Sequence, residues 1–402
     1  MTTPLHYLWL QCALGVSTAL RTQEILAAFP GGAGEIYSAS DYDRRVAGVF
    51  TNMQLSRLRS TPLSRAESVA EESARLHMHI LSPQDAAYPA RLLQIPNYPL
   101  VLYARGSVEA LQGHLPLAIV GTRKASRNSV DIAARLAADL VRAGCAVVSG
   151  GALGIDCAAH WGAVQAGGVT VAVQGCGLDY NYPPDNASLR KRIAEHGAVV
   201  SEYPPGTLPI GKNFPIRNRV ISGMAVGTVV IEAGERSGSL LTASSAAEQG
   251  RDVFAVPGDA FGSTFTGGNK LIREGAKPVF SAMDVLEDYE LLYPELLDMR
   301  RAERDLERAA VAPEKIKVKA PAKQNPQPPS PARGVAPQGR GERDDLPPLE
   351  QQILQLLSQS PMHIDRIMKE TAAPYGKLFT ALMHLEMQER IEQAPGKLYT
   401  KL

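Results

Sequence analysis

Three glycine-rich turns carry the residue types that most directly suggest chemistry in this 402-residue sequence. They occupy residues 121–123 (GTR), 149–154 (SGGALG) and 234–239 (GERSGS), and each follows a short apolar run and precedes a helical pattern. A single turn of this kind would be explained by the steric demand of a tight bend. Three of them bring hydroxyl groups and free helix N–H groups to one edge of a parallel sheet, so the pattern favours an anion site.

The residues beside these turns favour nucleic acid as the anion. Arg123 offers a planar guanidinium that can hold a phosphate with two hydrogen bonds. A long predicted loop, residues 202–219, adds an aromatic ring and three cations. Cations for the backbone and a ring for a base suit a single nucleic-acid strand. The DNA-binding residues that these features predict are Gly121, Thr122, Arg123, Ser149, Gly150, Gly151, Lys212, Phe214, Arg217, Arg219, Ser237, Gly238 and Ser239.

An alternative interpretation gives the residues of this loop a structural role. In it, Phe214 fills the core and Arg217 pairs with Glu202 or Glu232. Composition does not separate the two interpretations, because the net charge of the chain is only +1 and any nucleic-acid contact depends on local clusters.

Signatures of catalysis and of cofactor binding are sparse. The turn at 121–123 lacks the GxGxxG spacing of dinucleotide sites, and GxxxxGK[ST] is absent. Asp156 and His160 stand four residues apart on a predicted helix, but no nucleophile elbow or metal-binding motif accompanies them. We interpret Asp156 as stabilising the helix N-terminus and His160 as a structural hydrogen-bonding group, and Glu232 as the better acid. The sequence therefore predicts a binding protein without catalytic residues, cofactor or metal.

The elements that position these turns alternate between strands and helices. Strands are predicted at 117–120, 146–148, 169–173, 198–201, 226–231 and 253–256, with a probable edge strand at 100–103. Alternation of this kind is typical of a doubly wound, mostly parallel α/β sheet. We assign it to residues 81–290 as an extended Rossmann-like domain.

Three further regions flank this domain. Residues 1–80 predict a small helical, SAM-like domain, whose first segment reads as an amphipathic helix and not as an export signal. Residues 291–348 predict a charged, proline-rich linker. Residues 349–402 predict three short helices and a hairpin around Pro395 and Gly396, which describes a winged helix. With no membrane span and four separated cysteines, the pattern is typical of a cytoplasmic protein with reduced thiols.

The ordered motifs resemble the DNA-processing protein A family (DprA, also called Smf). They are AIVGTRKAS at 118–126, SGGALGIDCAAH at 149–160, GCGLDYNYPPDN at 175–186, SEYPPG at 201–206, NFPIRNRVISGM at 213–224, EAGERSGSLLTA at 232–243, GRDVFAVPGD at 250–259 and GGNKLIREGA at 267–276. Two positions depart from the family pattern. Thr122 stands where Ser is usual, and Gln174 replaces the usual aliphatic residue before GCG.

The resemblance implies a non-enzymatic recombination mediator in natural transformation. Such a protein, typically a homodimer, binds and protects incoming single-stranded DNA and loads the RecA recombinase, also in the presence of single-strand binding protein. The resemblance adds Asn218 to the predicted DNA-binding set, because the family's positive pocket maps onto Arg123, Lys212, Phe214, Arg217, Asn218 and Arg219, with backbone from Gly121, Gly150 and Gly151. The C-terminal region resembles a winged helix appended in many members. Its recognition helix, 375–389, offers only Lys377 beside Glu386 and Glu389, so duplex and protein binding both remain open there.

Two other functions compete with this one. The first is a nucleotide phosphoribohydrolase that uses Glu232, although its PGGxGTxxE signature is not present in EAGERSGSLLTA. The second is a regulator that binds a specific duplex through residues 349–402, with the Rossmann part sensing a small nucleotide.

Overall fold

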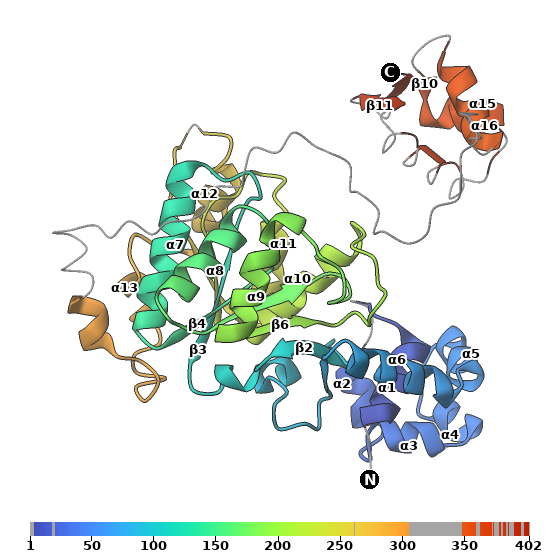
Figure 1. Ribbon diagram of the computed structural model, residues 1–402, viewed down its shortest axis with the longest axis horizontal. Coiled ribbons are helices and arrows are strands. Elements are labelled where there is room, and N and C mark those ends of the chain that lie inside the picture. Colours follow the sequence, from blue (N-terminus) through green and yellow to red (C-terminus); the bar gives the residue numbers. More distant parts are fainter. Residues whose placement is uncertain are drawn as a thin grey trace, which may run out of the picture. The chain divides into compact units, whose positions relative to one another are not determined.

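The computed structural model describes residues 4–17, 21–260, 262–304, 348–358, 362–371, 373, 378, 381–382, 385, 390–394 and 398–401. The chain forms two compact units, Met1–Gln324 and Asn325–Leu402 (Figure 1). The predicted linker falls largely on residues 305–347, which lie outside the described residues.

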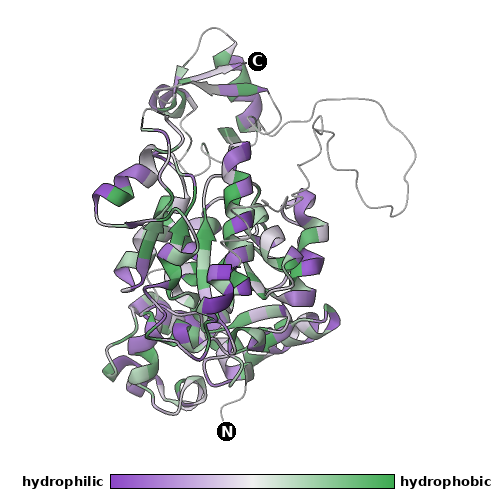
Figure 2. Cartoon of the chain, turned by 90° about the vertical axis from the view of Figure 1, so that its left-hand side faces the viewer, coloured by the Kyte–Doolittle hydropathy of each residue, from purple (hydrophilic) through white to green (hydrophobic). Residues whose placement is uncertain are grey.

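The described part of the first unit is built on one nine-stranded sheet in the order β1-β2-β6-β5-β4-β3-β7-β8-β9. Its strands are β1 (His79–Leu81), β2 (Leu102–Gly106), β3 (Leu115–Val120), β4 (Cys145–Ser149), β5 (Thr170–Gln174), β6 (Gly197–Ser201), β7 (Gly227–Val230), β8 (Asp252–Ala255) and β9 (Lys277–Pro278). Strands β3 to β9 are parallel to one another, and β2 pairs antiparallel with both β1 and β6. The central strands are buried on both faces, which explains why they read as continuous apolar runs (Figure 2).

Helices cover both faces of the sheet, so the predicted doubly wound fold is confirmed. They are α7 (Arg127–Arg142), α8 (Ile155–Gln165), α9 (Ala187–His196), α10 (Asn213–Met224), α11 (Ser239–Glu248), α12 (Thr266–Arg273) and α13 (Met283–Leu286), with the 3-10 turns η1 (Ala90–Gln94), η2 (Glu109–Leu111) and η3 (Pro184–Asn186). Helices α7 and α8 share one core cluster with β3, β4 and β7, and α10 and α11 pack into a cluster on the opposite face.

Two predictions about individual segments are wrong. The strand predicted at 100–103 is β2, which lies between β1 and β6 and is not an edge. The edge belongs to β1, which is too short at three residues to give a periodic signal. The loop predicted at 202–219 ends at residue 212, because α10 begins at Asn213. Pro215 falls in the first turn of this helix, where no intrahelical N–H bond is lost.

The N-terminal helices belong to the same compact unit as the sheet. They are α1 (Pro4–Leu14), α2 (Thr22–Ala27), α3 (Ala33–Ser38), α4 (Asp41–Val46), α5 (Asn52–Ser60) and α6 (Leu63–Arg75). Helix α1 is buried on most of its surface, so the amphipathic prediction is wrong. Its Gln11 accepts a hydrogen bond from Tyr103 of β2 and donates one to the carbonyl of Glu202. These contacts join the helices to the sheet.

The predicted domain boundaries at residues 80 and 290 both fall inside this compact unit. A boundary at residue 80 divides β1, whose residues pair with β2. Residues 291–304, predicted as linker, pack against the cluster of α7 and α8 through Leu296 and Leu297. The amide of Asp298 also donates to the carbonyl of Ala143. The apolar residues of this segment are interrupted by charges, which hides their burial in the sequence.

The second unit has the elements of a winged helix. Helices α15 (Pro348–Leu357) and α16 (Ile364–Thr371) accompany a sheet of order β10-β12-β11, made of β10 (Met362–His363), β11 (Ile391–Ala394) and β12 (Leu398–Lys401). The antiparallel pairing of β11 with β12 confirms the predicted hairpin. The described residues 378, 381–382 and 385 are helical, whereas Lys377, Glu386 and Glu389 of the predicted recognition helix lie outside the described residues.

None of the described helices has the length and apolar character needed to cross a membrane.

Candidate nucleic-acid interface

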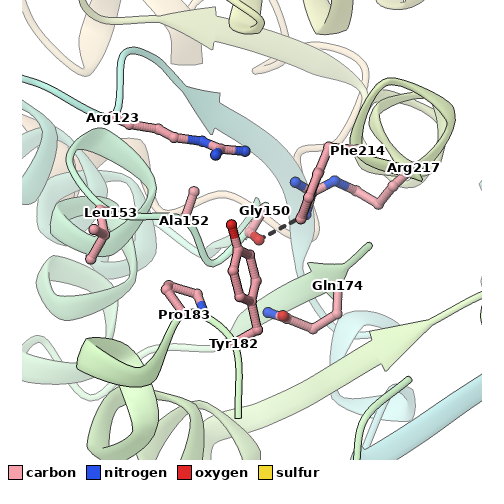
Figure 3. A pocket seen from close by; sticks show the side chains of 9 residues that line it. All are labelled: Arg123, Gly150, Ala152, Leu153, Gln174, Tyr182, Pro183, Phe214 and Arg217. Carbon is pink, nitrogen blue, oxygen red and sulfur yellow. Dashed lines mark hydrogen bonds between the residues drawn. The ribbon is translucent and has the colours of Figure 1, made fainter. Parts of the chain in front are cut away.

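The three glycine-rich turns meet at one edge of the sheet, as predicted. They follow β3, β4 and β7, which are neighbours in the parallel order β4-β3-β7. Beside the first two turns lies a hollow with an empty volume of about 350 Å³, part of it open to solvent. Its lining comes from three predicted turns or loops, from the end of β5 and from α10 (Figure 3). The residues are Arg123, Gly150, Ala152, Leu153, Gln174, Tyr182, Pro183, Phe214 and Arg217.

An aromatic ring and two cations form the centre of the hollow. The guanidinium carbon of Arg123 lies 5.1 Å from the ring centroid of Phe214, and that of Arg217 lies 5.8 Å from it. The ring of Tyr182 stands 5.5 Å from that of Phe214 at an interplanar angle of 36°. Phe214 is half-buried and Arg123 is exposed. The arrangement places an exposed cation and two half-buried aromatic rings beside a hollow that is partly open to solvent.

Contacts between neighbouring turns fix the position of Arg123. The amide of Thr122 donates to the carbonyl of Glu232 at 2.8 Å, which ties this turn to the end of β7. The amide of Ile155 donates to the carbonyl of Thr122 at 3.3 Å. Gly154 has φ +78, and a Cβ there would lie 2.4 Å from the oxygen of Thr122. Only glycine therefore lets the second turn approach the first so closely.

Arg217 is held inside the protein and not toward solvent. Its side chain donates to the carbonyls of Gly150 and Val173, and to the side-chain oxygen of Asn218 at 3.2 Å. Burial lowers the pKa of Arg217 to about 10, against the opposing attraction of Asp156. Burial also raises the pKa of Asp156, an effect that Arg217 offsets in part. Arg217 thus joins the second turn, β5 and α10 while it adds positive charge beneath the hollow.

Arg219 does not reach the hollow, although it belongs to the predicted DNA-binding set. It forms a buried ion pair with Glu202, at 2.7 and 2.8 Å to the two carboxylate oxygens, and both side chains are 4% exposed. Burial raises the pKa of Glu202, while the adjacent guanidinium lowers it. The alternative interpretation anticipated a buried pair with Glu202 but assigned it to Arg217. On α10, residues 217 and 219 face different neighbours.

The small polar residues of the predicted set have several roles. Ser149 is fully buried and donates to the carbonyl of Ile119, so it stabilises the junction of β4 with β3. Asn218 donates to the carbonyl of Gly238, which links α10 to the start of α11. Ser237 and Ser239 share a hydrogen bond of 2.8 Å at the same place. Other members of the predicted set that do not line the hollow are Gly121, Thr122, Gly151 and Lys212, of which Lys212 is exposed.

The acidic and histidine residues that were considered for catalysis occupy structural positions. Asp156 accepts from the amide of Ala152 at 3.3 Å in the first turn of α8. His160 lies 2.7 Å from the hydroxyl of Thr170, with no hydrogen bond to Asp156.

Among the described residues, the hydrogen-bond partners of the Glu232 carboxylate are serine and threonine groups and not arginines, and Glu232 does not line the hollow. Its carboxylate accepts from the amide and hydroxyl of Ser126, at 2.9 and 3.0 Å, next to the start of α7. This geometry does not support an acid role for Glu232 or a pair between Glu232 and Arg217.

Five residues that line the hollow are not in the predicted DNA-binding set: Ala152, Leu153, Gln174, Tyr182 and Pro183. Tyr182 comes from the loop between β5 and α9, where an aromatic residue among Gly, Pro and Asn was the available signal. Gln174 ends β5, and a polar residue after the apolar run 171–173 was a second signal. Neither residue could be placed beside Phe214 from the sequence, because the contact depends on the loop that follows β5 folding toward α10.

No group of three or more His, Cys, Asp or Glu suited to a metal ion occurs among the described residues.

Comparison with known proteins identifies the family. The DNA recombination-mediator protein A family matches residues 79–290, and the DprA winged helix domain matches residues 321–397. Protein Smf of Synechocystis sp. is 34% identical over 336 residues, which are 82% of this chain and 82% of that protein. DNA processing protein DprA of Streptococcus pneumoniae is 43% identical over 206 residues, 51% of this chain and 72% of that protein.

A solved structure agrees with this assignment. The X-ray structure of DNA processing protein A (DprA) from Streptococcus pneumoniae superimposes with a TM-score of 0.62 and 34% identity, covering 71% of this chain and 98% of that one. From the family match over more than half of the chain, together with these relatives, the chain belongs to the DNA recombination-mediator protein A family, known as DprA or Smf.

Proposed function

We propose that the chain binds single-stranded DNA at the hollow beside Arg123 and Phe214. The observation that carries the proposal is the exposed guanidinium of Arg123, which stands 5.1 Å from the half-buried ring of Phe214. A phosphate on Arg123 and a base on Phe214 and Tyr182 would use both kinds of contact that single-strand binding needs. Duplex DNA cannot offer the same contact, because its base faces are already stacked.

Family membership supports a role as a recombination mediator without catalysis. In this role the chain, as a homodimer, protects incoming single strands during natural transformation and loads RecA on them, including strands that carry single-strand binding protein. The hollow belongs entirely to the first unit, so we assign strand binding to that unit and leave the winged helix for a partner.

Fluorescence anisotropy with a labelled oligothymidylate and a duplex of equal length tests the binding step. The full chain should bind the single strand more tightly than the duplex. Phe214→Ala should weaken single-strand binding about 10- to 100-fold, because stacking contributes about 1–3 kcal/mol per base. The matched control is Phe280→Ala, which removes a ring that is 80% exposed and does not line the hollow. Equal losses in both variants, or a preference for duplex, would contradict the proposal.

The mediator step has its own test. RecA-driven strand exchange on DNA covered with single-strand binding protein should be accelerated by the wild-type chain and not by Phe214→Ala. Acceleration by both proteins would show that RecA loading does not need the hollow.

A further inference from the structure

The lining of the hollow includes a buried side-chain amide nitrogen without a hydrogen-bond partner in the described part of the chain. Nε2 of Gln174 is inaccessible to solvent and has no hydrogen-bond partner among the described residues. The residue is only 4% exposed, yet it lines the hollow at the end of β5. Buried amide donors in proteins are nearly always paired, so an unpaired one at a ligand site calls for an acceptor from the ligand.

The surrounding backbone has already engaged its oxygens elsewhere. Arg217 donates to the carbonyls of Val173 and Gly150, and Asn186 donates to that of Gly151 at 3.0 Å. The amide of Gln174 also lies directly over Gly151, where an added Cβ would come within 2.6 Å of Nε2. The absence of a Cβ at Gly151 thus leaves the space that this amide occupies, and Nε2 reaches a ligand when the side chain shifts toward the hollow.

The amide of Gln174 lines the same hollow as the two aromatic rings. The residue after Gln174 is Gly175, and a Cβ there would come within 2.8 Å of the ring of Phe214. In Figure 3 the amide of Gln174 points toward the ring of Tyr182. A planar base that packs on these rings would thus present its edge to Nε2, while its sugar and phosphate extend toward Arg123.

We propose that Gln174 is a specificity-determining residue that reads the edge of a bound base. Since the unused group is a donor, it selects a base with a carbonyl oxygen, such as thymine, over one without, such as adenine. This inference rests on the proposed binding of single-stranded DNA, and it gives the hollow a base preference that phosphate contacts alone cannot supply.

The test compares oligothymidylate with an oligonucleotide of equal length in which 2,4-difluorotoluene replaces thymine. The two bases share a shape, but the fluorinated ring is a very weak acceptor. Anisotropy with the full-length wild type should show a thymine preference of about 3- to 10-fold, the usual effect of one hydrogen bond. In Gln174→Met, which keeps the side-chain length without a donor, the preference should fall to about one. Gln165→Met, at an exposed position at the end of α8, should keep the wild-type preference.

The melting temperature separates this role from a purely structural one. If the amide stabilised the fold, its removal would lower the melting temperature. Removing an unpaired buried donor should leave the melting temperature of Gln174→Met equal to or above that of the wild type. Gln174→Leu serves as a second variant with the same expectations.

The following results would overturn the inference. One is a wild-type protein that binds the thymine and difluorotoluene oligonucleotides with equal affinity. Another is a thymine preference that stays unchanged in Gln174→Met or Gln174→Leu. A third is a lower melting temperature in both variants together with an unchanged thymine preference. Failure of the wild type to bind either oligonucleotide would instead refute the proposed single-strand binding itself, so the two failures are distinguishable.

Discussion

At the scale of single residues, neighbouring arginines of one helix have different tasks. Arg217 and Arg219 stand two residues apart on α10, and both are buried, but only Arg217 lines the hollow. Their types and spacing made them equal candidates for phosphate contact. The difference arises because residues two positions apart point to roughly opposite sides of a helix. On the side of Arg219, the 202–212 loop places the carboxylate of Glu202 within hydrogen-bond distance.

This assignment predicts a loss of stability without a direct loss of DNA contact. Arg219→Met should lower the free energy of unfolding by about 3–5 kcal/mol, because the carboxylate of Glu202 is left buried without its partner. Urea denaturation measures the change. The double variant Glu202→Leu with Arg219→Met should recover much of it, since no charge remains to be buried.

Single-strand affinity of the folded Arg219→Met protein should stay close to that of the wild type. A loss comparable with that of Phe214→Ala would place Arg219 in the interface after all.

At the scale of elements, the sequence predicts far more than it misses. The strands from 117 to 256 and the helices between them follow from apolar runs and glycine turns, and all six strands are found in the parallel part of the sheet. The start of α10 was missed because Asn213 and Pro215 resemble loop residues. Edge strand β1 was missed because three residues carry no periodicity. Contacts between loops, such as Tyr182 with Phe214, are not encoded in any local pattern.

The stability of the fold depends on pH through His160, which lies between α8 and the sheet. The hydroxyl of Thr170 donates to the carbonyl of Val147, so it accepts from Nδ1 of His160, which places the proton of the neutral ring on Nδ1. Burial, followed by the charge of Arg217, lowers the pKa of His160 to about 3. The unfolded chain binds this proton near pH 6.5 and the native chain does not. Stability is therefore lost as the pH falls from about 6.5 toward 3.

The expected contribution of His160 is about 1.4 kcal/mol per pH unit in that window. Urea denaturation between pH 6.5 and 4.5 should show a slope that is shallower in His160→Gln by about this amount. Identical slopes in the two proteins would mean that His160 is protonated in the native state.

At the scale of the whole molecule, the two compact units divide the proposed work. The hollow and its supporting contacts lie within Met1–Gln324, and the helices and hairpin of the winged helix lie within Asn325–Leu402. The boundaries that the sequence predicts at residues 80 and 290 lie close to the limits of the family match at 79–290, but both fall inside the first compact unit. Core packing crosses both positions, and packing between distant segments leaves no local signal at a boundary.

Removal of the second unit should therefore leave strand binding intact. A chain of residues 1–324 should match the oligothymidylate affinity of the full chain within about twofold, as expected for independent regions. Residues 325–402 alone should not bind the single strand. Sequence-specific duplex binding by residues 325–402, together with lost affinity in the shorter chain, would favour a regulator that acts through the winged helix.

The central claim is that Arg123 binds the phosphate backbone of a single DNA strand. A salt titration tests this claim most directly. Oligothymidylate affinity should fall steeply with salt, because each neutralised phosphate adds about 0.7 to the logarithmic slope. Arg123→Ala should bind about 10- to 100-fold more weakly at low salt, with a slope that is shallower by at least about 0.7. Arg135→Ala, at an exposed position of α7 away from the hollow, should behave as the wild type. Unchanged affinity and slope in Arg123→Ala would contradict the claim.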